Sequence, residues 1–286
     1  MPKGRRNTPN RLATRRSIAL ESGGSPGLAL VGAPAADDLK VVLDPGLDLA
    51  ESVGDIASEL VRAVAAARTP LDAELALSPV LGMLDRLAPP DAAPEPRAAM
   101  VADLLGGLIA WAQAAPSAAA LALLRVIAAL GGPAIEQHAR SSADLVAASG
   151  IPDRPWATSL GGPELIRAWW YGDVYGEQES VALQFDYHHR EHTLCVLIDH
   201  ELGGGVKDCW IAPGHQSRQL HDRTAAQMAD NPEAQFKDID ATRALKTLQA
   251  ALTHPPCPVL DDQVEDVTTY LPILRARVTT LARSAR

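Results

Sequence analysis

The apolar side chains of this chain follow two different periods, and the change falls near Gly150. Before it, Leu49, Val53, Ile56, Leu60 and Val64 recur at helical steps of three and four residues. Such a stripe predicts an amphipathic helix. Comparable stripes follow Thr69-Pro70, run through Met100 to Trp111, follow Ser117, and follow Pro133. Thr69 and Ser117 are good N-cap residues, so we expect five helices joined by short turns, arranged as a bundle.

After Gly150, residues 165–212 concentrate aromatic and β-branched side chains in short runs with polar turns between them. Alternation such as Val181, Leu183, Phe185 is typical of half-buried strands. We predict four antiparallel strands at about 165–171, 179–187, 192–201 and 206–212. The expected turns are at 172–179, 188–191 and 203–205, where three glycines suit a hairpin.

Beyond Pro213 the helical period returns, at about 218–229, after the predicted cap Asp240, and from Val267 to Leu281. The predicted fold class is therefore α+β, with an N-terminal helical bundle, a four-stranded β-meander and C-terminal helices packed on the sheet. The expected organisation is a disordered tail over 1–35, a bundle over 36–150 and an α+β region over 151–286.

The charge distribution limits the classes of partner. A formal net charge of -9 gives a field that repels nucleic acids and anionic lipids over most of the surface. Residues 1–16 have the opposite charge, with six basic residues and no acidic one. Nucleic-acid binding is therefore expected only through this tail, if at all, and no membrane partner is expected.

The cysteines and the N-terminal residues indicate the cellular compartment of the protein. Cys195, Cys209 and Cys257 are an odd, small set that suggests no disulfide framework. The basic N-terminus is not followed by the apolar run of a signal peptide, and the longest apolar run, near 118–130, contains Arg125. These features predict a cytoplasmic protein.

The strongest candidate for chemistry is His200. If the hairpin closes at 203–205 with a three-residue loop, His200 lies opposite Asp208 on the apolar face, beside Trp210. A carboxylate can hold the imidazole in one tautomer, as a general base requires. The alternative is a histidine that is hydrogen-bonded at the edge of the core for structural reasons only.

The second candidates for chemistry are Asp199 and Glu201, on the opposite face in the same strand register. That register places Asp199 across from Cys209 and Glu201 across from Lys207. Charges of both signs on one face of an antiparallel sheet are also what solvent exposure alone would produce.

Histidines and carboxylates are dense between 186 and 201, but their spacing matches no established metal motif. Gly-x-Ser-x-Gly, P-loop and dinucleotide fingerprints are absent as well. We therefore predict no metal and no cofactor.

Trp169, Trp170, Tyr171 and Tyr175 form an aromatic cluster in a chain with only 4% aromatic residues. Neighbouring residues on a strand point to opposite faces, so at least one tryptophan lies away from the main core. An exposed one would mark a surface for a protein partner, and packing on both sheet faces is the alternative.

Three functions follow in order of preference. A non-catalytic interaction or scaffold protein comes first, because no catalytic motif matches. A hydrolase that uses His200 with Asp208, or Asp199 with Glu201, is the alternative. A nucleic-acid-associated factor acting through the basic tail is the third.

Overall fold

A computed structural model describes residues 49–87, 94–257 and 267–284 of the chain. The predicted disordered tail, 1–35, lies outside these ranges. The helices in the described ranges are α1 (Leu49–Ala66), α2 (Pro70–Leu87), α3 (Pro94–Ala114), α4 (Ala118–Leu130), α5 (Pro133–Ala148), α6 (Gly214–Ala229), α7 (Ala241–Leu252) and α8 (Leu271–Ser284). The strands are β1 (Glu164–Asp173), β2 (Gln178–Asp186), β3 (Glu191–Asp199), β4 (Gly205–Pro213) and β5 (Ala234–Ile239).

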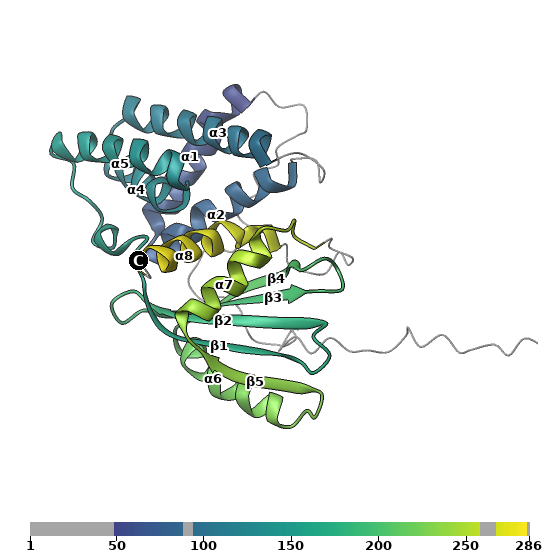
Figure 1. Ribbon diagram of the computed structural model, residues 1–286. Coiled ribbons are helices and arrows are strands. Elements are labelled where there is room, and N and C mark those ends of the chain that lie inside the picture. Colours follow the sequence, from purple (N-terminus) through teal and green to yellow (C-terminus); the bar gives the residue numbers. More distant parts are fainter. Residues whose placement is uncertain (1–48, 88–93, 258–266, 285–286) are drawn as a thin grey trace, which may run out of the picture.

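The N-terminal helices begin where their capping residues predict. Thr69 accepts a hydrogen bond from the backbone N–H of Asp72, whose carboxylate accepts from the N–H of Thr69 in return. Ser117 caps α4 through the N–H of Ala120. Helices α1 to α5 then bury their apolar stripes in one shared core, which also includes Ile273 of α8 (Figure 1).

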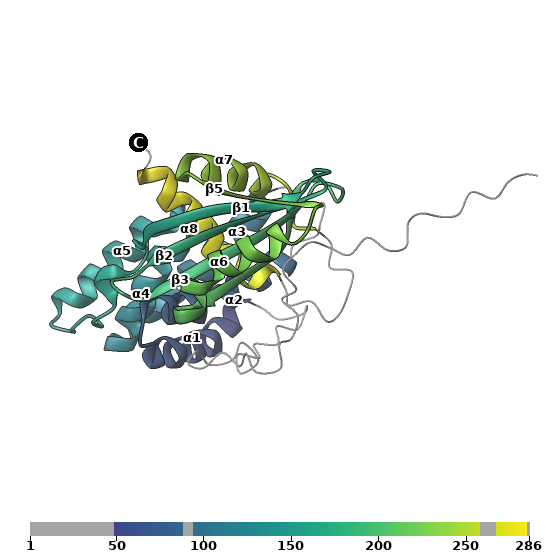
Figure 2. The same ribbon diagram turned by 90° about the horizontal axis from the view of Figure 1, so that it is seen from below.

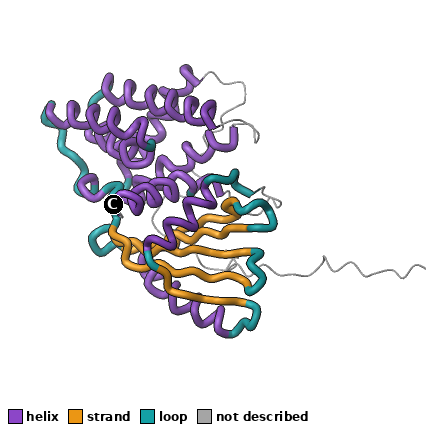
Figure 3. Tube along the Cα trace, viewed as in Figure 1, coloured by secondary structure: helices purple, strands orange, loops and turns teal. Residues whose placement is uncertain are grey.

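The sheet is antiparallel throughout, with the strand order β4-β3-β2-β1-β5. The first four strands run as the expected meander, but a fifth strand, β5, pairs with β1 and corrects the four-stranded prediction (Figure 3). β5 is only six residues long and half exposed, with Lys237 and Asp238 in its second half. A short edge strand with such polar residues lacks the alternation that identifies a strand in sequence.

Both faces of the sheet are covered. One face packs Val181, Leu183 and Phe185 against α7 and α8. The other packs Trp169 and Cys195 against Leu220 of α6. Figure 2, seen from below, has α6 in front of the strands, while α7 lies beyond them. The face that carries Asp199 in the predicted register is therefore closed by a helix rather than open to solvent.

No helix in the described ranges is both long and apolar enough to cross a membrane.

Candidate functional site

The predicted pairing of His200 with Asp208 is wrong. β3 ends at Asp199, which pairs with Gly205, so His200 lies in the turn and not on a strand. A bulge at the start of β4 then places Asp208 opposite Leu197. A bulge adds one residue to one strand, and a one-residue change moves every later side chain of that strand to the other face. Trp210 therefore joins the α6 face, whereas Cys209 faces α7 and α8.

His200 has a different carboxylate partner. Its Nε2 lies 2.9 Å from Glu179 Oε1, while the other oxygen of Glu179 accepts from the indole N–H of Trp170. The His200 side chain is 44% exposed, so the pair sits on an open turn. The geometry orients the imidazole on an exposed surface.

The carboxylate of Asp199 is held by hydrogen bonds at the base of the β3–β4 hairpin. Asp199 is 3% exposed and accepts hydrogen bonds from Gln178, the N–H of Leu202 and Lys207, the last at 2.7 Å. Burial opposes ionisation, but these donors outweigh it and hold the pKa of Asp199 below its ordinary value. A carboxylate so tied is a structural anchor and a poor proton acceptor.

The four predicted catalytic residues do not converge. Glu201 lies in the exposed turn between β3 and β4. It pairs with no strand residue of the described sheet, so it does not lie opposite Lys207. Asp208 lies on the α6 face, where burial raises the pKa of its carboxyl. The predicted pairing of Asp199 with Cys209 is also wrong, because Cys209 lies opposite Val196.

The aromatic cluster divides between the two faces of the sheet. Trp169 and Tyr171 are buried under α6, and burial raises the pKa of Tyr171. Trp170 is half-buried on the other face, with the Lys237 ammonium 5.2 Å from its ring centroid. Tyr175 is 53% exposed in the β1–β2 turn, and its hydroxyl donates to Glu233. No tryptophan of this cluster is exposed, so packing accounts for most of it.

The described residues contain no group of three or more histidine, cysteine or acidic side chains placed to hold a metal ion. The three cysteines are free thiols, and all three are buried. Burial raises the pKa of Cys195 and Cys209, which keeps both as unreactive thiols.

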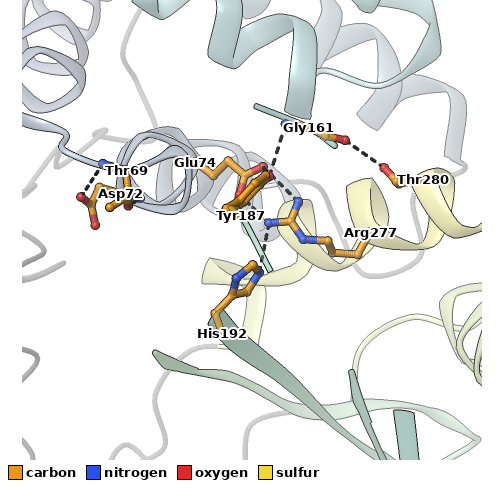
Figure 4. A network of polar contacts seen from close by, with 8 residues as sticks. All are labelled: Thr69, Asp72, Glu74, Gly161, Tyr187, His192, Arg277 and Thr280. Atoms are coloured by element: carbon orange, nitrogen blue, oxygen red, sulfur yellow. Dashed lines mark hydrogen bonds and ion pairs between the residues drawn. The ribbon is translucent and has the colours of Figure 1, made fainter. Parts of the chain in front are cut away.

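A buried ion pair joins the helical region to the sheet. Arg277 of α8 donates two hydrogen bonds to Glu74 of α2, and both side chains are fully buried (Figure 4). The hydroxyl of Tyr187 donates to the same carboxylate at 2.7 Å. The guanidinium also lies over the rings of Phe185 and Tyr187. These contacts pair the two buried charges with each other, while the Nε–H of Arg277 has no hydrogen-bond partner among the described residues.

His192 completes this network on the side of the sheet. Arg277 donates to its Nε2 at 3.4 Å, and because arginine cannot accept, this nitrogen carries no proton. Burial, together with the neighbouring guanidinium charge, lowers the pKa of His192 well below 6.5. The ring is stacked between Phe185 and Tyr187. His192 is therefore a neutral core residue.

The network continues into the loop before β1. The Tyr187 hydroxyl accepts from the N–H of Gly161, and Thr280 of α8 donates to the Gly161 carbonyl (Figure 4). Gly161 has a φ of +74°, which favours glycine, and the loop passes close to Ala129 of α4. These bonds fix the loop between α4 and α8.

The fixed loop forms one wall of a cavity of about 510 Å³. The other walls come from the end of α4, the start of α5, α8, and parts of α2 and α3. Its charged lining residues are Arg125, Arg140, Arg275, Arg283, Glu136 and Asp153. Its threonines are Thr158, Thr279 and Thr280. The cavity lies among these helices and the loop before β1, and a space between packed helices is a common position for ligand sites.

Helix α8 provides the polar wall through its spacing. Arg275, Thr279 and Arg283 recur every four residues and so share one face of the helix. Leu274, Arg277 and Val278 occupy the buried face. One helix thus serves both the buried ion pair and the cavity.

The carboxylates of the cavity are held by its arginines. Glu136 accepts from Arg140 at 2.7 Å and from Arg283. The bond from Arg283 is the main cause that lowers the pKa of Glu136. Arg125 donates to Asp153 and to Asp144, which ties α4 to α5 and to the loop. Ionised, paired carboxylates of this kind are weak general bases.

Sequence reasoning missed the cavity because its walls come from segments far apart in the chain. The signal that could have found it is the polar stripe Arg275, Thr279, Arg283 on an otherwise apolar helix.

Comparison with family models, with curated proteins and with solved structures found no match to this chain.

Proposed function

We propose that this chain is a non-catalytic binding protein whose ligand site is the cavity between α4, α5, α8 and the Gly161 loop. The cavity itself carries the proposal. Its volume of about 510 Å³ falls within the range of small-molecule sites, roughly 300–1,000 Å³.

The composition of the walls favours binding over catalysis. Within the described ranges, the lining includes no histidine, cysteine, serine or lysine. Its acidic side chains, Glu136 and Asp153, are both bonded to arginines. Enzyme sites ordinarily place a nucleophile or an acid–base group with a perturbed pKa beside the substrate. These walls offer hydrogen-bonding groups that can recognise a ligand, without an arrangement of nucleophile and acid–base group.

The hydrolase alternative has less support. The His200–Glu179 pair is well oriented, yet neither residue lines the cavity. A protein partner, which the sequence suggested through the aromatic cluster, also has less support, because Trp169 and Tyr171 are buried.

A cavity-filling variant tests the proposal. Ala128 lines the cavity, so Ala128→Phe would occupy it, while the matched control Ala110→Phe adds the same ring at an exposed helix position. Ligand-observed NMR with a panel of neutral, anionic and cationic small molecules would measure binding. We expect at least one class to bind the native protein and the control, and to lose binding in Ala128→Phe. Equal binding of every class by both variants would contradict the proposal.

A further inference from the structure

The inference rests on the proposed function and names the chemistry of its ligand. We infer that the cavity binds an amphipathic organic anion, with its charged head on the arginines of α8 and α5 and its apolar body against the apolar lining residues of α2, α3 and the loop.

The two walls differ in chemistry. Arg275, Thr279 and Arg283 of α8 and Arg140 of α5 supply hydrogen-bond donors on one side. Leu81 of α2, Val101 of α3 and Leu160 of the loop supply apolar surface elsewhere in the lining. A ligand with only a charged head would leave the apolar wall in contact with water, and a purely apolar one would take the guanidinium groups out of water without adding a hydrogen bond to them.

The charge of the lining selects an anion. Arginines outnumber carboxylates among the lining residues, although the whole chain has a formal net charge of -9. The first residues of α5, Gly132-Pro133, also line the cavity, so the positive end of that helix faces it. Guanidinium groups bind carboxylates and phosphates through paired N–H donors. The shared ligand chemistry is therefore a carboxylate, sulfate or phosphate head on an apolar body.

Variants of Glu136 and Arg283 should change the affinity for an anion in opposite directions. Its carboxylate already bridges Arg140 and Arg283, so an incoming anion must compete with it. Glu136→Gln removes that competitor and should tighten anion binding. Arg283→Gln removes a donor and should weaken it.

The test is isothermal titration calorimetry with four probes: octanoate, octyl phosphate, octanol and inorganic phosphate. We expect octanoate or octyl phosphate to bind at least about tenfold more tightly than octanol and inorganic phosphate, since a charged hydrogen bond and apolar burial each contribute to affinity. Comparison of octanoate with octyl phosphate identifies the head group.

The variants distinguish a cavity effect from a general one. Arg283→Gln should weaken binding of the anionic probe about fivefold or more, and Glu136→Gln should strengthen it, with octanol unchanged in both. Arg62→Gln is the control, since Arg62 is an exposed, paired arginine on α1 that does not line the cavity.

Two results would overturn the inference and leave the proposed function standing: octanol binding as tightly as the anions, or Glu136→Gln and Arg283→Gln shifting anion affinity in the same direction. Absence of binding by all probes, with no effect of Ala128→Phe on any ligand class, would instead remove the proposed function itself.

Discussion

Replacing Arg277 by methionine should destabilise the protein strongly. Arg277 and Glu74 are fully buried and lie 203 positions apart in sequence, so the pair ties α8 to α2. In Arg277→Met, the Glu74 carboxylate loses both guanidinium donors and keeps the hydrogen bond from the Tyr187 hydroxyl. Breaking a buried ion pair in this way costs about 3–5 kcal/mol, because one charge stays buried without its partner.

A loss of this size is a large fraction of the free energy of unfolding of a typical protein, which is about 5–15 kcal/mol. The free energy of unfolding would be measured by urea titration, with the denaturant slope required to stay constant. A double variant, Glu74→Gln with Arg277→Met, removes both charges and keeps an acceptor for Tyr187. We expect it to be more stable than Arg277→Met alone by about 1–3 kcal/mol.

A loss below about 1 kcal/mol in Arg277→Met would show that the pair contributes no more than an exposed ion pair does, which is incompatible with its burial. A double variant in which the two single losses simply add would be equally incompatible, because charges in direct contact must be coupled.

Three further predictions concern stability. The lowered pKa of His192 means that, as pH falls, the imidazole takes up a proton in the unfolded chain before it does so in the folded protein. The free energy of unfolding should therefore fall below pH 6.5, by up to about 1.4 kcal/mol per pH unit. Urea titrations at several pH values should show a weaker dependence of this free energy on pH in His192→Phe. Asp240 accepts from the N–H of Arg243 at the start of α7, so Asp240→Ala should cost about 1 kcal/mol in the same assay. A Cβ on Gly82 of α2 would collide with the Thr268 backbone, whereas one on Gly106 of α3 meets nothing within 4 Å. Calorimetry should therefore find a lower melting temperature for Gly82→Ala and an equal or higher one for Gly106→Ala.

Much of the secondary structure could be predicted because it depends on local periodicity. The alternation of Val181, Leu183 and Phe185 identified β2, and the caps Ser117 and Asp240 marked the starts of α4 and α7. These signals lie within a few residues of the elements that they define.

The strand register could not be predicted with the same success. Phe185 pairs with His192, not with Leu194, because the four-residue β2–β3 turn spans 187–190 rather than 188–191, and this moves each pairing by two residues. A shift of two preserves the faces, so the apolar face was still identified correctly. The β3–β4 turn takes in residues 200–204 rather than 203–205, so His200 is no longer on the strand, and the bulge in β4 changes the count by one and moves Asp208 to the other face.

The buried ion pair was missed for a different reason. Glu74 and Arg277 resemble ordinary helical surface charges in sequence, and only tertiary packing brings them together. Their one signal is position: Arg277 lies next to Val278 and three residues after Leu274, on the apolar stripe of α8. A charge on such a stripe requires a buried partner, but sequence does not say where the partner is.

We propose above that the cavity beside α8 holds a small ligand by its arginines. The most direct measurement is a crystal structure of the protein with the tighter of octanoate and octyl phosphate at saturating concentration. We expect the molecule to lie in this cavity, with its head within hydrogen-bonding distance of Arg275 or Arg283 and its chain toward Leu81 and Val101. An ordered ligand elsewhere on the protein, with this cavity unoccupied, would contradict the proposal.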